Sequence, residues 1–194
     1  LIKVGTLTLS GNILGGASLE VTGNTAMAAN VTTAGTQTYT GAVSQTEAAT
    51  LTTTNSNIIF GNTVIGDASD DGLTIAAGNG IVQFVGTVGA GGGNNDVGAI
   101  AITGGLNLDA AITSAASLTV STTSDIGASV TTSGIQTYTG AATISADSTL
   151  TTTNSNIIFG NTVVGDASDD DLTIAIGNGI VQFVGTVGAG GGNN

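Results

Sequence analysis

Aspartate residues gather in two turns of nearly the same sequence, and their carboxylates are the side chains best suited to bind an ion. The first turn carries Asp67, Asp70 and Asp71, and the second carries Asp166, Asp169, Asp170 and Asp171. Carboxylates this close together, beside a serine hydroxyl and turn carbonyls, supply the oxygen ligands that Ca²⁺ prefers. Their spacing matches no EF-hand loop, and a solvated acidic corner that keeps the protein in solution is the alternative. We treat these aspartates as a candidate calcium site.

Residues 91–96 form a second candidate for calcium binding. They read Gly-Gly-Gly-Asn-Asn-Asp, which is close to the calcium-binding nonapeptide Gly-Gly-x-Gly-x-Asp. The fourth position is Asn instead of Gly, and the motif is not repeated in tandem. A glycine-rich loop without a metal is therefore the favoured interpretation.

The rest of the composition argues against catalysis. The chain has no His, no Cys and a single cationic side chain, Lys3. It therefore offers no imidazole or thiolate nucleophile, no histidine general base and no zinc site of the usual ligands. A pair of carboxylates alone can cleave a glycoside, but no aromatic residues stand beside the aspartates to hold a sugar. We expect a protein that is not an enzyme and that needs no cofactor, with Ca²⁺ as the one candidate.

The net charge restricts the partners. A formal charge of −12 provides no basic surface for phosphate groups, so we expect no nucleic-acid partner. An anionic membrane surface would repel the chain. No apolar run approaches the roughly 20 residues that a membrane-spanning helix needs, so we expect no membrane insertion.

The elements that must position these residues follow an internal repeat. Residues 51–95 return at 150–194 with 42 of 45 positions identical, whereas the first fifty positions of each copy share only 20. The spacing is 99 residues throughout, without a gap. We therefore assign one repeat to residues 1–99 and a second to residues 100–194. No boundary between globular domains separates them, so we expect one continuous structure.

Within each copy, short β-branched segments alternate with clusters of Gly, Asn, Asp and Ser, a pattern typical of strands and turns. We expect strands at 6–10, 18–22, 31–33, 37–40, 51–54, 57–64, 73–76, 81–88, 99–103, 106–108 and 117–121. The main strands begin about 20 residues apart, an interval that fits one coil of a β-solenoid. Four or five coils per copy, at roughly 4.8 Å each, give a unit about 20–25 Å long.

Alternation within the strands assigns side chains to the inside or the outside of the coil. The runs 7–9 and 118–120 place a Thr between two aliphatic residues. A period of two puts neighbours on opposite faces, so Leu, Val and Ile are expected inside and Thr outside. Gly-Asn-Gly steps at 78–80 and 177–179 supply the positive φ that corners need. We also expect all four phenylalanines in the core: Phe60, Phe84, Phe159 and Phe183.

The outward threonines and the two tyrosines are minor candidates for binding. An array of hydroxyls suits ice or glycans, although Thr is also a good strand former with a polar face. The tyrosines, Tyr39 and Tyr138, have rings that can stack on sugars, but about 20 Å between two rings does not make a platform. The threonines expected in the array are Thr6, Thr8, Thr52, Thr54 and Thr119.

Four motifs of the first copy recur in the second, and the resemblance that they carry extends over nearly the whole chain in both copies. They are Val-Thr-Thr-Ala-Gly-Thr-Gln-Thr-Tyr-Thr-Gly-Ala at 31–42, Leu-Thr-Thr-Thr at 51–54, Ile-Ile-Phe-Gly-Asn-Thr-Val at 58–64 and Leu-Thr-Ile at 73–75. As a set they resemble the repeats of very large bacterial surface proteins of the filamentous-haemagglutinin type. This resemblance implies a right-handed parallel β-helix, export across the outer membrane, and a role in surface fibres or adhesion. No part of the chain resembles a secretion domain, a cap or a receptor-binding tip, so the resemblance identifies it as shaft.

We therefore expect a structural shaft segment of a bacterial extracellular surface fibre. Both ends of the chain look like coils from the middle of a solenoid, and uncapped coils expose backbone groups that pair with further strands. The expected partners are further copies of the same repeat, in a longer array or a head-to-tail filament, with host or matrix glycans as a second class. The alternative is a Ca²⁺-dependent or a glycan- or ice-binding adhesion module, and an autotransporter stem is a third possibility.

Overall fold

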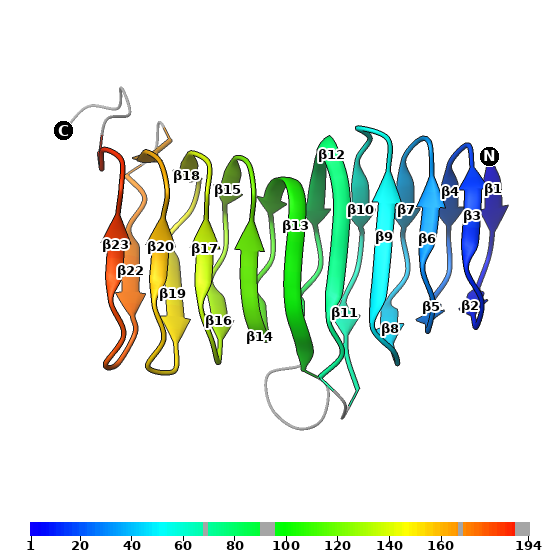
Figure 1. Ribbon diagram of the computed structural model, residues 1–194, viewed down its shortest axis with the longest axis horizontal. Helices are drawn as coiled ribbons and strands as arrows, with labels where there is room; N and C mark the ends of the chain where they lie inside the picture. The colour runs from blue at the N-terminus through cyan, green and yellow to red at the C-terminus, as the bar shows by residue number, and fades with distance from the viewer. Residues whose placement is uncertain (68–69, 90–95, 167–168, 189–194) are drawn as a thin grey trace.

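Short strands separated by Gly, Asn and Ser corners wind the chain into a β-solenoid (Figure 1). The computed structural model describes residues 1–67, 70–89, 96–166 and 169–188. Every element within these ranges is a β-strand, and the strands pair in parallel from one turn to the next. The predicted all-β solenoid is confirmed, and its right-handed sense stays a prediction.

Each turn has three faces, which we number in chain order. Face 1 holds β1 (Ile2–Val4), β4 (Leu19–Val21), β7 (Gln37–Tyr39), β10 (Ile58–Phe60), β15 (Ser124–Ile126), β18 (Ala142–Ile144) and β21 (Val163–Gly165). Face 2 holds β2 (Leu7–Leu9), β5 (Thr25–Met27), β8 (Val43–Gln45), β11 (Val64–Ile65), β16 (Val130–Thr132), β19 (Ser148–Thr152) and β22 (Leu172–Ala175). Face 3, nearest the viewer in Figure 1, holds β3 (Ile13–Gly16), β6 (Val31–Thr33), β9 (Ala49–Thr53), β17 (Gln136–Tyr138), β20 (Ile157–Phe159) and β23 (Val181–Phe183).

Three long strands near the middle run round a corner and belong to two faces. β12 (Leu73–Phe84) and β13 (Val97–Leu108) pass from face 3 to face 1, and β14 (Ile112–Val120) passes from face 2 to face 3. They join the ladders of different faces into one 19-stranded sheet. Nine turns separate Ile2 from Val187 along face 1.

The turns lengthen along each copy of the repeat. Paired residues lie 18 positions apart at Leu19 and Gln37, 21 apart at Gln37 and Ile58, and 24 apart at Ile58 and Val82. The second copy repeats the series at Leu118, Gln136, Ile157 and Val181. The strands keep their register, so the added residues enlarge the corners.

The sequence-based strand boundaries needed several corrections. The segment expected at 57–64 is divided by a corner into β10 and β11, whereas 73–76 joins the following segment to form β12. The strands at 13–16, 25–27 and 43–45 were not expected. Their inward positions carry Gly16, Thr25 and Gln45 instead of aliphatic residues, so the apolar alternation is interrupted there.

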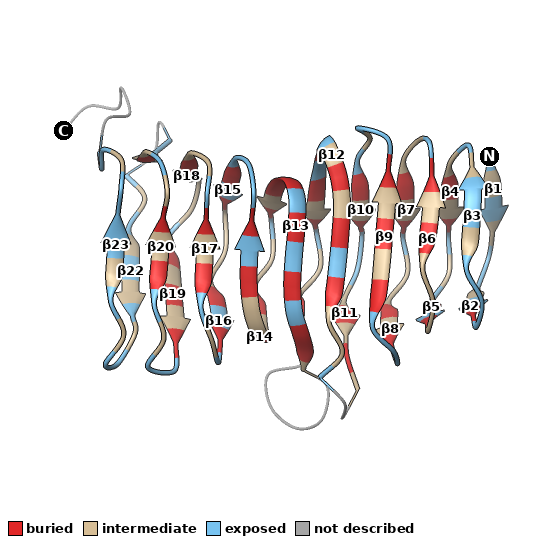
Figure 2. Ribbon diagram, in the orientation of Figure 1, coloured by how far each residue is buried: buried red, intermediate tan, exposed pale blue. Residues whose placement is uncertain are grey.

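Inward side chains stack in ladders along the axis and form the core. Figure 2 shows the buried positions of neighbouring strands in the middle turns. The rings of Tyr39, Phe60 and Phe84 stack with centroids 5.4 and 5.0 Å apart, an offset arrangement that adds to the burial of apolar area. The rings of Tyr138, Phe159 and Phe183 form the same stack in the second copy. The expectation that all four phenylalanines lie in the core is wrong for Phe183, which is 41% exposed because β23 belongs to the last turn.

A buried glutamine supports each aromatic stack. Gln37 Nε2 donates hydrogen bonds to the carbonyl oxygens of Val31 and Thr52 and to Thr33 Oγ1, and Gln37 Oε1 accepts one from the Tyr39 hydroxyl. The second copy repeats this network around Gln136. Every polar group of the glutamine side chain therefore has a partner, which a buried amide requires.

Some threonines depart from the expected outward direction. Thr33 and Thr132 are buried, and their hydroxyls donate to the carbonyl oxygens of Gly35 and Gly134, respectively. Each such Thr ends a strand, so its side chain closes the corner that follows. The alternation of aliphatic residues and Thr along the strands predicted Thr on the outside and did not reveal that these threonines close corners.

Asparagines hold the largest corners together. Asn55 has a φ of 54°, and its Oδ1 accepts a hydrogen bond of 3.0 Å from the Asn79 amide one turn later. Gly78, with a φ of 63°, lies beside it. The second copy repeats the corner with Asn154 and Gly177, so the positive φ expected in the Gly-Asn-Gly steps is confirmed for their first glycine.

Candidate functional site

The first acidic turn lies at the corner between faces 2 and 3. Gln45 Nε2, inside the coil, donates to the carbonyl oxygens of Asp71 and Gly72 at 3.3 and 2.8 Å. The amide of Gly98 donates to the Asp71 carbonyl from the following turn. The backbone of this turn is thus held by the coil, which uses two of the carbonyls expected for Ca²⁺. Asp67 and Asp70 belong to the same corner, and residues 68 and 69 lie outside the described ranges.

The second acidic turn lies at the corner between faces 1 and 2, and gathers more negative charge. Burial raises the pKa of the half-buried Asp170 carboxyl. A hydrogen bond with Asp166 and the negative charge of Asp166 raise this pKa further. The charges of Asp147 and Asp169 act in the same direction. The amide of Asp171 donates to Asp147 Oδ1 at 2.9 Å. Asp147 stands where the first copy has Ala48, so this crowding is specific to the second copy.

Neither acidic turn forms a cage for an ion among the residues that the structure describes. Within those ranges, no group of three or more His, Cys, Asp or Glu side chains is arranged to hold a metal. The glycine-rich candidate 91–96 lies outside the described residues except for Asp96. The Oδ1 atom of Asp96 is enclosed and makes no hydrogen bond with the described residues. Calcium binding stays a prediction.

The tyrosines cannot serve as sugar-stacking surfaces. Tyr39 and Tyr138 are fully buried in the aromatic stacks. Burial also raises the pKa of both hydroxyls, which keeps them protonated as donors to glutamine. Their role is therefore in the core.

The expected threonine array is divided among different surfaces. Thr52 and Thr119 lie on face 3 and point outward, whereas Thr8 lies on face 2. Thr6 and Thr54 occupy corners. The five residues do not form one flat surface, although Thr52 pairs with Thr32 and Thr119 with Thr137 in neighbouring turns.

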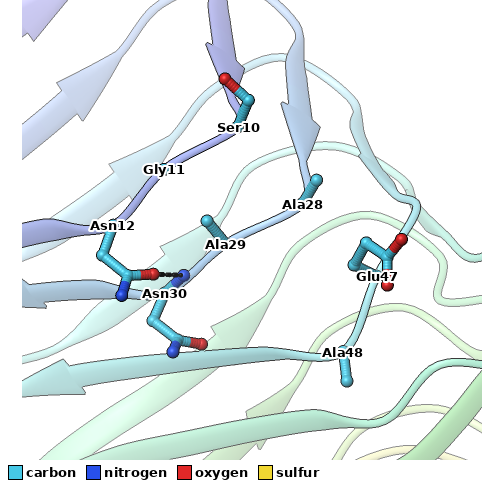
Figure 3. A pocket seen from close by; sticks show the side chains of 8 residues that line it. All are labelled: Ser10, Gly11, Asn12, Ala28, Ala29, Asn30, Glu47 and Ala48. Atoms are coloured by element: carbon cyan, nitrogen blue, oxygen red, sulfur yellow. Dashed lines mark hydrogen bonds between the residues drawn. The ribbon is translucent and has the colours of Figure 1, made fainter.

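A shallow hollow of about 650 Å³ follows the corner between faces 2 and 3 in the first three turns (Figure 3). Asn12 Oδ1 accepts a hydrogen bond from the Asn30 amide, and Asn30 Oδ1 accepts one from the Thr50 amide. Glu47 is the only charged residue in its lining. The asparagine oxygens are thus used to join successive turns, and the hollow offers no pair of reactive groups.

The two ends of the solenoid are the least covered apolar surfaces. At the C-terminal end, Val187 is 55% exposed and Phe183 is 41% exposed, and Leu172 and Ile174 are only partly buried. At the N-terminal end, Ile2, Leu7 and Ile13 are likewise only partly buried. Figure 2 shows this change from the buried middle to the exposed final turns. These are inward side chains of the ladders, and at each end no further turn lies over them.

Comparisons with known proteins add no assignment. No family model, no curated protein and no solved structure matches this chain. None of the elements in the described ranges is a helix of the length and apolar character that crossing a membrane requires.

Proposed function

We propose that this chain is a structural shaft segment of a bacterial extracellular surface fibre, in which further copies of the same repeat continue the solenoid from its ends. The parallel ladder and the buried stacks along the axis supply stiffness. A repeat protein of this kind gains stability from each interface between neighbouring turns. The resemblance of the repeats to filamentous-haemagglutinin-type proteins supports the location and the bacterial origin.

The proposal rests on a difference in solvent exposure between equivalent residues of the two copies. Phe84 is fully buried beneath β13, whereas Phe183, which stands at the same position of the second copy, is 41% exposed. Val88 and Val187 differ in the same way, at 0% and 55%. Because the sequences around them match, only the presence of a following turn separates the two environments. This difference supports the proposal that another turn covers the last one.

The chemistry of the side surfaces supports a passive role. The described faces carry one salt bridge, between Lys3 and Glu20, and no cation other than Lys3 exists in the chain. Polar side chains at the corners mainly accept hydrogen bonds from backbone amides of the next turn. Such groups stabilise the coil and leave no acid–base pair for catalysis, so we propose that the protein is not an enzyme.

Electron microscopy of the purified chain tests the proposal. We expect filaments at high protein concentration, and we expect Phe183→Asp to abolish them because it puts a charge into the apolar end. Gln182→Asp is the matched control, since Gln182 lies on the same strand and points outward; it should leave filaments intact. Far-UV circular dichroism verifies that both variants keep their β structure. A wild-type chain that stays monomeric at all concentrations would contradict the proposal.

One observation favours a second candidate, a Ca²⁺-dependent adhesion module that presents the acidic turns to host or matrix glycans. Burial raises the pKa of Asp170 most, and the neighbouring carboxylates of Asp166, Asp147 and Asp169 raise it further; a bound cation would relieve the repulsion among these carboxylates. Thermal melts in EDTA and in millimolar Ca²⁺ test this candidate. A large upward shift of the melting temperature with Ca²⁺, lost in Asp170→Asn, is expected if it is correct. Equal melting temperatures would reject it.

A further inference from the structure

We infer that the C-terminal turn of this chain receives the N-terminal turn of a second copy in one rotational setting, in which β23 pairs with β2 of the partner. This inference rests on the proposed function and adds to it the register and the angle of the junction. It follows from a mismatch between the repeat in the sequence and the turn of the solenoid.

The 99-residue repeat does not contain a whole number of turns. From Gln37 on face 1, four turns along the ladder lead through Leu106 to Ser124, which is still on face 1. Gln136, the counterpart of Gln37, lies two faces further along the same turn, on face 3. One repeat therefore spans four and two-thirds turns, and each copy is rotated by one face relative to the copy before it.

Features in the two copies display this rotation. The aromatic stack that begins at Tyr39 lies on face 1, whereas the stack that begins at Tyr138 lies on face 3. The acidic turn of the first copy lies between faces 2 and 3, and that of the second copy lies between faces 1 and 2. Every element of the repeat is shifted in the same sense.

The junction between the copies inside the chain is the template for a junction between two chains. There, Val82 pairs with Leu106, Gln83 with Asn107 and Phe84 with Leu108. The 99-residue spacing makes Val181 to Phe183 in β23 the counterparts of Val82 to Phe84. In the same way, Leu7 to Leu9 in β2 are the counterparts of Leu106 to Leu108. The two ends then match as the internal junction does, with Phe183 over Leu9 and Gln182 beside Thr8.

A second face agrees with this setting. Val88 pairs with Ile112 inside the chain, and their counterparts, Val187 and Ile13, are the exposed and partly buried residues at the two ends. The setting also brings β1 onto β22. The internal pair Ile75 and Ile102 corresponds there to Ile174 and Lys3, and because Lys3 points outward, β1 must shift by one residue to cover β22 with Ile2 and Val4. β22 begins directly after the acidic residue Asp171, so the only cation of the chain approaches the more acidic corner.

A filament built in this way has a defined symmetry. Each molecule contributes two repeats, or nine and one-third turns, so successive molecules are rotated by one-third of a turn. At roughly 4.8 Å per turn, the rise per molecule is about 45 Å. The acidic corners then follow a spiral around the shaft instead of a single stripe, which separates like charges and presents the same chemistry on every side.

Disulfide trapping tests the setting, because the chain has no cysteine of its own. A chain with Gln182→Cys is mixed in turn with chains that carry Thr8→Cys, Leu14→Cys or Lys3→Cys, and each mixture is oxidised briefly. These three positions point outward on β2, β3 and β1 and represent the three rotational settings. Adjacent strands bring Cα atoms within the range that a disulfide spans.

We expect Thr8→Cys to give about tenfold more cross-linked heterodimer than either of the other two variants. More cross-linking with Leu14→Cys or Lys3→Cys would overturn the inference while leaving end-to-end assembly intact. If no pair cross-links and no filaments form, the proposed function fails together with the inference. Image reconstruction of the filaments supplies a second readout, and a rotation other than one-third of a turn per molecule would overturn the inference.

Discussion

The two copies of the repeat place the same residues in different surroundings. In the first copy, Val82, Phe84 and Val88 are covered by the next turn and are inaccessible to solvent. In the second copy, Phe183 and Val187 face solvent, and Val181 is only partly buried. The burial of a ladder residue in this fold is therefore a property of its neighbours along the axis. Local sequence sets which way a side chain points, and the next turn decides whether it is covered.

The largest difference in stability is expected between the alanine variants of Phe84 and Phe183. Phe84→Ala opens a cavity in the middle of an aromatic stack and should reduce the free energy of unfolding by about 3–5 kcal/mol. Phe183→Ala removes a partly exposed ring and should cost about 1–2 kcal/mol in the monomer. Urea unfolding at low protein concentration measures both. Equal losses would show that the last turn is already covered in the isolated chain.

The buried glutamines should behave alike in both copies, because each has turns on both sides. Gln37→Leu and Gln136→Leu each leave a tyrosine hydroxyl and backbone carbonyls without partners, and should cost about 2–3 kcal/mol. Gln83→Leu is the control, since the hydrogen bond from Gln83 to Asp109 is exposed, and its cost should stay below about 0.5 kcal/mol. A clear difference between the Gln37 and Gln136 variants would undermine the comparison.

The asparagine corners should give a smaller effect that is also equal in the two copies. Asn55→Ala and Asn154→Ala combine a positive φ with the loss of an acceptor for the next turn, and should cost about 1–2 kcal/mol. Glycine at either position keeps the backbone conformation and should recover part of the loss. Thermal unfolding of the four variants measures this. If glycine is no better than alanine, backbone strain does not contribute.

The smallest effect concerns pH and should occur only in the second copy. The pKa of Asp170 is raised in the folded protein, so the folded state binds a proton more readily than the unfolded chain. The stabilisation is complete below the unfolded pKa of about 4 and is lost as pH rises through the raised folded value.

Asp147→Ala removes one of the charges that raise this pKa and should weaken the pH dependence. Hydrogen exchange of β22 at pH 4 and pH 7 measures the effect, with β9 and β12 around the first acidic turn as the internal control. The same pH dependence in Asp147→Ala and in the wild type would contradict the assignment of the rise to this corner.

The sequence predicted the class of fold because aliphatic residues alternate with Thr in strands such as β2 and the end of β14. It did not reveal all three faces of the turn. Gly16, Thr25 and Gln45 occupy inward positions and conceal the pattern there. The rotation between copies was also hidden, since it depends on strand pairing, and the repeat length of 99 residues does not state how many turns it contains.

The candidate sites were less accessible to sequence reasoning. The acidic turns were visible as clusters, but the approach of Asp147 to Asp170 joins residues of successive turns and needs the register. The tyrosines were considered as a surface feature, although each is followed by an aromatic residue 21 positions later, a spacing that could have indicated the stack. Gln37 and Gln136 were missed because nothing in a polar residue followed by a threonine indicates that it points inward.

Hydrogen exchange of β23 against protein concentration tests the central claim most directly. The amides of Val181 to Phe183 should exchange rapidly in dilute solution and become at least about tenfold more protected when the protein is concentrated. The matching amides of Val82 to Phe84 should be protected at both concentrations. If β23 is as well protected as this part of β12 in dilute solution, or if concentration leaves its exchange unchanged, the end of the solenoid does not receive another turn.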